Sequence, residues 1–377
     1  MKKILFAAST LSHIENFHIP YLKYFKDTGF EVHIIGKENN KLLIPYVDKV
    51  IPINFEKNMF SIKNFISAFR ISKLIRKEKY SIISTHTILA SFFTRLGIML
   101  SLKEHPLVIN TVHGYLFDEN SNILKKNIMI LAEKFVRPVT DTLLVMNSTD
   151  YEIAKKYSLY KKNLYSIDGM GINALKFPFS TEENKSYLRE KYNIPKDDFL
   201  LIYVAEFSKR KNQLFLIDSI KSLISEGYNN VKLLLIGDGI LLNNMKEYSK
   251  TLGIENNIIF KGYIKEVYDY YQISDICVSS SRIEGLPFNL MEAMSTGLPV
   301  IASKIKGHID LVDPEENGFL YEYNNINEFC KHVKILYNDR DLLNKMRISS
   351  HNLSKNYSLE SVFPEITRIM INEIKNI

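Results

Sequence analysis

Two carboxylates in the second half of the chain stand on either side of a predicted turn. Glu284 and Glu292 are separated by seven residues. The apolar run 275–278 before them predicts a buried strand, and the pattern over 288–296 predicts a helix. In open α/β sheets, ligands bind where a strand end leads into a helix start, and the free N–H groups there favour phosphate. The alternative is a surface loop followed by an ordinary amphipathic helix.

Two histidines occupy comparable positions in the first half. His86 ends the predicted strand 81–86, and His113 follows the predicted strand 107–112. In a doubly wound sheet both would lie at carboxyl edges of strands, where sites form. Each could instead be a buried structural histidine.

The segment 9–17 is expected to be a loop after the first strand, which covers 3–8. Its polar side chains could meet an acceptor, or they could simply face water or cap a helix. These side chains, with the histidine just after the segment, are His13, Glu15, Asn16 and His18.

Apolar runs and helical patterns alternate in both halves of the chain. A chain of 377 residues is too long for one typical core. The sequence therefore predicts an α/β protein with two doubly wound, Rossmann-like domains facing a cleft. We expect the first domain over 1–180, the second over 181–360, and a final helix over 361–377.

The second half resembles the retaining glycosyltransferases of family 4, which have the two-domain GT-B fold. The resemblance rests on the spacing of Glu284 and Glu292 and on the residues around them. These are Arg282, Gly285, Ala293-Met294, Gly297-Leu298-Pro299 and Asn317-Gly318-Phe319-Leu320. It covers most of 199–355 and, more loosely, 1–180, where Thr85-His86-Thr87 and His113-Gly114 resemble bacterial polysaccharide-assembly members.

The resemblance implies transfer of a sugar, with its anomeric configuration retained, from a nucleotide-diphosphate sugar. The default nucleotide is UDP, and the acceptor is a saccharide or lipid-linked saccharide in capsule, exopolysaccharide or lipopolysaccharide synthesis. It also implies that the second domain binds the donor, that the first lies on the acceptor side, and that the final helix crosses back to the first domain. No cofactor is expected, and no Asp-x-Asp motif stands out, so a divalent metal is not expected to be essential.

The resemblance also implies roles for individual residues. His113 would touch the donor sugar or its phosphate, Glu284 would bind the sugar hydroxyls, and Glu292 would accept hydrogen bonds from the ribose. The remaining expected substrate-binding residues are Lys211, Arg210, Gly285, Leu286, Phe288, Asn289, Tyr263 and His86.

One departure from the family pattern concerns the cations that face the donor diphosphate. Lys211 matches the usual lysine, but Glu206 stands where an arginine is usual. Arg210 or Lys209 could replace that arginine, or this segment could be a solvated basic turn. Glu206 keeps open a nucleotide-sugar-binding protein without transfer activity. Another GT-B enzyme, such as a sugar-nucleotide epimerase, is a further alternative.

Charge is unevenly distributed along the chain. Residues 1–185 hold 26 Lys and Arg against 17 Asp and Glu, whereas residues 186–377 hold 23 against 25. A basic half is expected to attract an anionic partner. The helix predicted over 61–79 could lie on an anionic membrane surface, or pack on the sheet with a solvated basic side. No nucleic-acid recognition motif is present, so nucleic acid is not expected as a partner.

The remaining features concern location. Cys277 and Cys330 are the only cysteines, which argues against a disulfide scaffold, and no Cys/His spacing typical of a zinc site occurs. The short apolar run after Lys3 is expected to be a strand rather than a signal peptide. We therefore expect a cytoplasmic protein, either free or peripheral on the inner membrane face.

Overall fold

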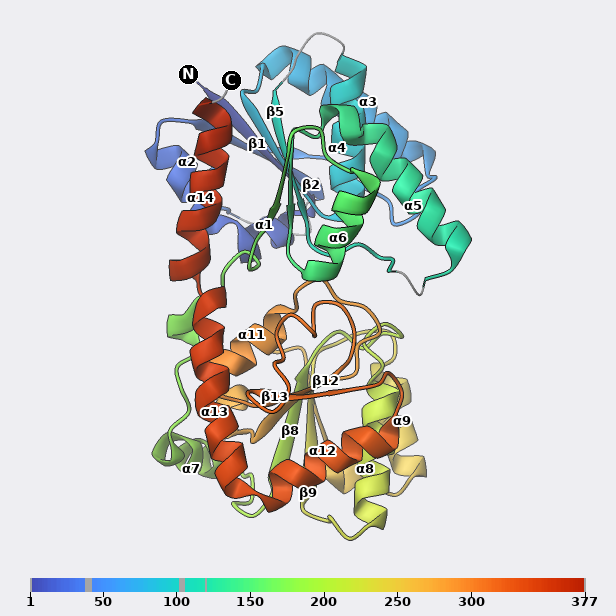
Figure 1. Cartoon of the computed structure of the whole chain (residues 1–377), viewed down its shortest axis with the longest axis vertical. Helices are drawn as coiled ribbons and strands as arrows, with labels where there is room; N and C mark the ends of the chain where they lie inside the picture. The colour runs from blue at the N-terminus through green and yellow to red at the C-terminus, as the bar shows by residue number, and fades with distance from the viewer. Residues whose placement is uncertain (1, 38–42, 102–105, 119–120, 376–377) are drawn as a thin grey trace. The chain divides into compact units, whose positions relative to one another are not determined.

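The computed structural model describes residues 2–37, 43–101, 106–118 and 121–375. By its internal contacts the chain separates into two compact units (Figure 1). Unit 1 contains residues 1–171 together with 360–377, and unit 2 contains residues 172–359. The sequence-based boundaries lay at 180/181 and 360/361.

Unit 1 is built on a seven-stranded parallel sheet with the order β3-β2-β1-β4-β5-β6-β7. Its strands are β1 (Lys3–Thr10), β2 (Glu31–Lys37), β3 (Lys49–Pro52), β4 (Ile82–His86), β5 (Leu107–Val112), β6 (Thr142–Val145) and β7 (Asn163–Ser166). Its helices are α1 (Leu11–Phe17), α2 (Ile19–Asp27), α3 (Ile62–Glu78), α4 (Ile88–Ser101), α5 (Ile123–Val136), α6 (Ser148–Tyr157) and α14 (Leu359–Lys375). Strands β4 and β5 are buried along their whole length, as expected for parallel strands covered on both faces.

Unit 2 is built on a six-stranded parallel sheet with the order β10-β9-β8-β11-β12-β13. Its strands are β8 (Phe199–Val204), β9 (Val231–Ile236), β10 (Ile258–Gly262), β11 (Ile276–Ser279), β12 (Val300–Ser303) and β13 (Gly318–Tyr321). Its helices are α7 (Glu182–Lys191), α8 (Gln213–Ser225), α9 (Leu242–Thr251), α10 (Tyr268–Ile273), α11 (Phe288–Ser295), α12 (Ile326–Asn338) and α13 (Arg340–Ser354). The prediction of parallel, doubly wound sheets in both halves is confirmed.

One local prediction is wrong. The segment 9–17 is not a loop, because β1 runs to Thr10 and α1 follows at once. Thr10 Oγ1 accepts a hydrogen bond from His13 N (3.3 Å) and so caps this short helix. Helix α13 begins directly after α12, because the Asp339 side chain accepts a hydrogen bond from Leu342 N.

The last helix, α14, belongs to unit 1 for almost its whole length. Glu373 Oε1 accepts hydrogen bonds from Asn163 Nδ2 (2.8 Å) and from the Tyr165 hydroxyl (3.2 Å), and the Phe363 ring lies 5.2 Å from that of Tyr21. None of the helices within the described ranges combines the length and the apolar character needed to cross a bilayer.

Candidate functional site

The sheet of unit 2 has a topological switch point between β8 and β11. Strand β8 pairs with β9 on one side and β11 on the other, so the loops that follow β8 and β11 leave the same edge of the sheet in opposite directions. Crevices of this kind are where open α/β sheets bind ligands. The first loop carries Arg210 and Lys211, and the second carries Glu284.

These three side chains form a compact charged cluster. Lys211 Nζ lies 2.5 Å from Glu284 Oε1, and Arg210 Nη1 lies 3.0 Å from Glu284 Oε2. Burial alone would raise the pKa of the Glu284 carboxyl, but the positive charges of Lys211 and Arg210 outweigh it and lower the pKa to about 2. Burial lowers the pKa of Lys211, and Glu284 opposes that shift. The cluster therefore holds a buried carboxylate between two cations.

Side-chain hydroxyl groups connect β8 and the loop after it to the loop after β11, next to this cluster. The Tyr203 hydroxyl, on β8, lies 2.7 Å from Ser281 Oγ, and Ser280 Oγ donates to the backbone oxygens of Lys211 and Asn212, both at 2.9 Å. These hydroxyl contacts were not predicted from the sequence. The run of three serines that ends β11 was the available signal, because small hydroxyl side chains can bond a neighbouring loop's backbone.

Close backbone packing also fixes the turn that carries Glu284. Gly307 has a φ of +79°, and a Cβ at this position would lie 2.2 Å from the Gly285 oxygen. Only glycine fits both the backbone conformation and the space. The turn 284–285 thus rests directly against the backbone of the segment after β12.

Glu292 lies in the second helical turn of α11, the helix that follows the 284–285 segment in the chain. Its Oε2 accepts a hydrogen bond from the Tyr271 hydroxyl (3.2 Å). Burial raises the pKa of Glu292 to about 7, and the Tyr271 hydrogen bond offsets only part of that shift. The N-cap of α11, Pro287, provides no side-chain hydrogen bond to the first turn. This first turn contains Phe288 and Asn289, both half-buried, and Leu286 is buried just before it.

A pocket of about 350 Å³ lies at the carboxyl ends of β8, β9 and β10. Tyr263 and Ile264 line it together with Glu206 and Asp238. Tyr263 is 76% exposed, so most of its surface is accessible. Lys209, in contrast, is exposed, whereas Arg210 and Lys211 pair with Glu284.

In unit 1, four histidines gather at the carboxyl edge of β1, β4 and β5. His86 Nδ1 lies 3.2 Å from His113 Nε2, and His86 Nε2 lies 2.9 Å from Ser84 Oγ. The His18 ring lies 4.0 Å from that of His86, and the His13 ring 4.7 Å from that of His113. The sequence analysis singled out all four histidines, and the structure brings them together.

These imidazoles are held neutral near pH 7. Burial lowers the pKa of His13 to about 4, and burial together with neighbouring histidines lowers the pKa values of His18 and His86 well below the usual range. The pKa of His113 is lowered in the same way, by burial and by His13. Among the described residues, neither ring nitrogen of His18 has a hydrogen-bond partner.

Part of this cluster could hold a metal ion. His13, His18 and His113 each offer a nitrogen atom, and these atoms lie within 4.8 Å of one another. Neutral imidazole is a ligand for transition metals such as zinc. A second group, formed by Glu31, His33 and Glu78, is already occupied by ion pairs, because Lys3 lies 2.7 Å from the Glu78 carboxylate.

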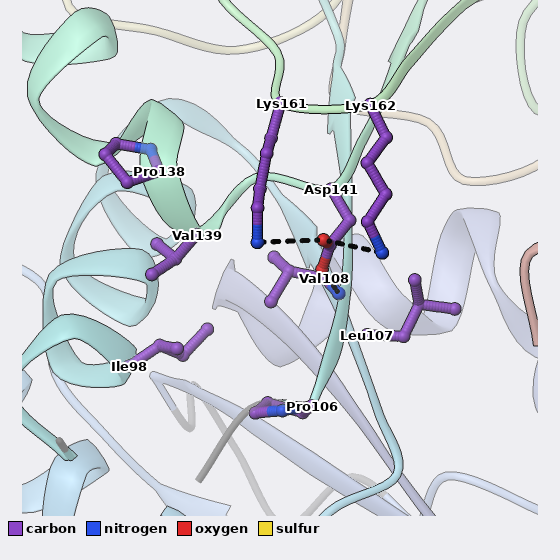
Figure 2. Close-up of a pocket in the computed structure, with 9 residues that line it drawn as sticks. All are labelled: Ile98, Pro106, Leu107, Val108, Pro138, Val139, Asp141, Lys161 and Lys162. Carbon is purple, nitrogen blue, oxygen red and sulfur yellow. Dashed lines mark hydrogen bonds and ion pairs between the residues drawn. The ribbon is translucent and has the colours of Figure 1, made fainter. Parts of the chain in front are cut away.

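A different pocket of unit 1, of about 140 Å³, lies at the opposite edge of the same sheet (Figure 2). Figure 2 shows Lys161 and Lys162 pointing toward Asp141, at 3.6 Å and 3.3 Å from its Oδ1. Asp141 Oδ2 also accepts from Val108 N (3.1 Å). These groups stand where β5 and β6 begin, and both lysines pair with the same aspartate, which also bonds the β5 backbone, so we regard the cluster as structural.

Comparisons with known proteins give a consistent result. A family described as "Glycosyl transferase 4-like" matches residues 3–168, and one described as "Glycosyl transferases group 1" matches residues 184–352. The chain is 31% identical over 345 residues to EpsD of Bacillus subtilis (strain 168), a protein assigned as a glycosyltransferase, covering 92% of this chain and 90% of that one.

Two further proteins are similar. The UDP-Gal:α-D-GlcNAc-diphosphoundecaprenol α-1,3-galactosyltransferase of Escherichia coli is 28% identical over 342 residues, covering 88% of this chain and 86% of that one. The crystal structure of Anabaena HepE in complex with UDP shares the fold, with a TM-score of 0.80 and 16% identity over 99% of this chain and 100% of that one. Because these matches span both units, the chain belongs to the 4-like and group 1 glycosyltransferases and has their GT-B fold.

Proposed function

We propose that this glycosyltransferase uses a UDP-sugar as donor and moves the sugar, with retention of configuration, to a saccharide carried on a lipid diphosphate. The observation that carries the proposal is the cluster of Arg210, Lys211 and Glu284 at the switch point of unit 2. Two buried or half-buried cations suit a diphosphate, and the carboxylate between them suits sugar hydroxyls. Relatives support the choice of substrates: HepE has been solved with UDP and with UDP-glucose. The name of the E. coli relative gives a UDP-sugar donor, a lipid-diphosphate acceptor and an α linkage.

The donor would replace contacts that the free protein makes internally. Its diphosphate would take hydrogen bonds from Lys211 and Arg210 and from the first N–H groups of α11, where the helix dipole favours negative charge. Each charge-assisted bond of this kind contributes roughly 1.5–3 kcal/mol. Glu284, released in part from its cations, would accept hydrogen bonds from the sugar. Gly285 leaves room for the donor to approach the backbone of this turn.

The nucleoside would lie next to this diphosphate site. Glu292 would accept hydrogen bonds from the ribose hydroxyls. The base would enter the pocket lined by Tyr263, and this exposed aromatic ring suits stacking. Glu206 lines the same pocket and carries a negative charge, so we place no diphosphate contact on it.

The reaction itself needs stabilisation of a leaving diphosphate. The bond between the anomeric carbon and the diphosphate oxygen breaks, and the acceptor oxygen bonds to that carbon on the same face. The acceptor's hydroxyl proton passes to the departing phosphate oxygen, so no side-chain base is required. His113, neutral at pH 7, would donate a hydrogen bond to the donor sugar or its phosphate. The hydrogen bond between His86 and His113 would hold the His113 ring in position.

We also propose that transfer needs no bound divalent metal. Arg210 and Lys211 provide the positive charge that a metal would otherwise bring to the diphosphate. The Asp-x-Asp of the sequence, Asp339-Arg340-Asp341, lies at the start of α13, where Asp339 caps the helix. The histidines of unit 1 would then act as hydrogen-bonding groups rather than ligands.

A thermal-shift panel tests the donor site. UDP, GDP, ADP and their sugars are compared on the wild type, on Glu292→Ala and on the control Glu247→Ala, whose side chain is 71% exposed on α9. A ligand at 100 times its Kd adds roughly 2.7 kcal/mol of stability. We expect stabilisation by UDP compounds in the wild type and the control, and its loss in Glu292→Ala. No shift with any nucleotide in folded wild-type protein would contradict the proposal.

A further inference from the structure

Helix α3 exposes four large apolar side chains along its first half, although Ala68, Ile71 and Ile75 of the same helix pack into the core. Phe65 and Phe69 are 49% and 51% exposed, although the neighbouring Asn64 is fully buried. Asn64 Nδ2 donates to the backbone oxygens of Glu56 (3.1 Å) and Asn58 (2.9 Å), and its Oδ1 accepts from Glu56 N (2.8 Å). These bonds fix the rotation of the helix about its axis. The exposed apolar residues of α3 are Ile62, Phe65, Ile66 and Phe69.

Helix α5 shows the same arrangement. Its buried side contains Glu133, whose carboxylate forms two hydrogen bonds with the Arg95 guanidinium of α4, at 2.9 Å and 3.0 Å. Arg95 is completely buried. An apolar row recurs at helical spacing on the outer side of α5, with between 41% and 70% of each side chain exposed. This row consists of Leu124, Ile128, Leu131 and Phe135.

Helix α4 joins the two surfaces. Both α3 and α5 pack against it, and the three helices lie together beside the first sheet (Figure 1). Leu100 of α4 is 44% exposed, and Phe92 and Leu96 are half-buried. We call the surface formed by the apolar residues of α3, α5 and Leu100 the α3–α5 face. With Ile123 at the start of α5, nine of the 25 large apolar side chains exposed in the described chain lie on α3 and α5, so they form a concentrated patch rather than scattered positions.

The exposed charges of α3 and α5 are all positive. Their two acidic residues point inward: Glu133 pairs with Arg95, and Glu78 pairs with Lys3 (2.7 Å) and Lys49 (2.6 Å). Lys73 Nζ lies 4.7 Å from the centre of the Phe69 ring, so cations and aromatic rings are interleaved. The basic residues of the two helices are Lys63, Arg70, Lys73, Arg76, Lys77, Lys125, Lys126 and Lys134.

We infer that the α3–α5 face docks on the surface of an anionic lipid bilayer. Apolar side chains enter the boundary between headgroups and acyl chains, while Lys and Arg meet the anionic headgroups. A second copy of the chain fits less well, because self-association would bring two sets of like charges together. The inference rests on the proposed function in one respect: an acceptor carried on a lipid gives the enzyme a reason to work at a bilayer.

Vesicle co-sedimentation of the full chain tests this inference. Vesicles of phosphatidylcholine alone are compared with vesicles that also contain phosphatidylglycerol. We expect binding to the anionic vesicles, weakened about fivefold for each cation removed and so roughly a hundredfold in Lys63→Gln/Arg70→Gln/Lys73→Gln. Phe69→Ser/Leu131→Ser should lose binding to a similar degree. The matched control is Ile348→Ser, which removes a 58% exposed apolar side chain from α13.

Three outcomes would overturn the inference. These are equal binding to neutral and anionic vesicles, patch variants that bind like the wild type, and a wild-type dimer that Phe69→Ser/Leu131→Ser dissociates in light scattering. A thermal shift with UDP measures the donor site separately. Patch variants that keep this shift but lose vesicle binding support docking, whereas a wild-type protein that binds anionic vesicles but shows no shift with UDP counts against the donor site alone.

Discussion

At the scale of single residues, the candidate site residues of unit 2 are charged, whereas those of unit 1 are neutral. Unit 2 presents a carboxylate clamped by two cations, and unit 1 presents buried imidazoles without charge. This division suits a donor whose charge lies in its diphosphate and whose sugar offers only hydroxyl groups. Two predictions follow at this scale, one for each unit.

The first concerns His86 as a positioning residue for His113. Its Nδ1 bonds His113, and its Nε2 bonds Ser84. An asparagine amide can replace Nδ1, whereas a glutamine amide reaches the place of Nε2. We expect His86→Gln to lower kcat about tenfold to a hundredfold with a small change in KM, because His113 loses its support. His86→Asn should retain most of the rate. Equal kcat values for the two variants in steady-state kinetics would remove this role.

The second concerns Glu292 and pH. Its pKa is about 7 in the folded protein, against an ordinary value of 4.5, so the folded state binds its proton more tightly than the unfolded state. Glu292 therefore stabilises the fold fully below about pH 4.5, and this contribution is lost as pH rises through 7, a change of about 3 kcal/mol. In urea unfolding, Glu292→Gln should lose less stability than the wild type between pH 5 and pH 8. Glu247→Gln is the control, and parallel curves for the wild type and Glu292→Gln would contradict the shift.

At the scale of elements, the turn that carries Glu284 depends on its backbone neighbour. Gly307→Ala would place a Cβ 2.2 Å from the Gly285 oxygen, while Gly253→Ala meets nothing within 4 Å. Their φ angles, +79° and +67°, cost a similar amount of backbone strain. We expect Gly307→Ala to lower kcat/KM at least tenfold and Gly253→Ala to leave it within about twofold, since only the former displaces the turn. Equal kcat/KM values in the two variants would show that this packing does not position Glu284.

The sequence predicted the helices and strands that have a strong hydrophobic pattern. It missed those whose formation depends on a single contact. Apolar runs and helical spacing located β8, β11 and α11, and with them Glu284 and Glu292. Helix α1 has only seven residues, too few for a periodic pattern, and its Thr10 cap looked like part of a loop. No prediction was made for α5.

The orientation of α3 could not be predicted from the sequence, for a different reason. Its apolar residues recur at helical spacing, which ordinarily marks the buried side. The bonds of Asn64 turn the apolar residues of the first half of α3 outward, while Ile71 and Ile75 stay in the core. These bonds depend on the backbone at 56–58, which no local pattern specifies. The link between Arg210 and Glu284 spans 74 residues and likewise required the folded sheet.

At the scale of the whole molecule, the features that carry the two proposals lie in different units. The excess of basic residues lies in the first half of the chain, as does the α3–α5 face, whereas the donor cluster lies in unit 2. A glycosyltransferase with this division can keep one unit at a bilayer and bind a water-soluble donor with the other. Membrane docking and donor binding should therefore respond independently to mutation.

The central claim is transfer from a UDP-sugar with retention of configuration. The most direct measurement follows the reaction by NMR, with UDP-sugars, a lipid-diphosphate-linked saccharide and EDTA present. We predict release of UDP, a product with the anomeric configuration of the donor, and loss of at least tenfold in kcat/KM for Lys211→Ala, since a charge-assisted bond is worth about 1.5 kcal/mol or more. An inverted product, or no transfer from any UDP-sugar by folded protein, would contradict the account.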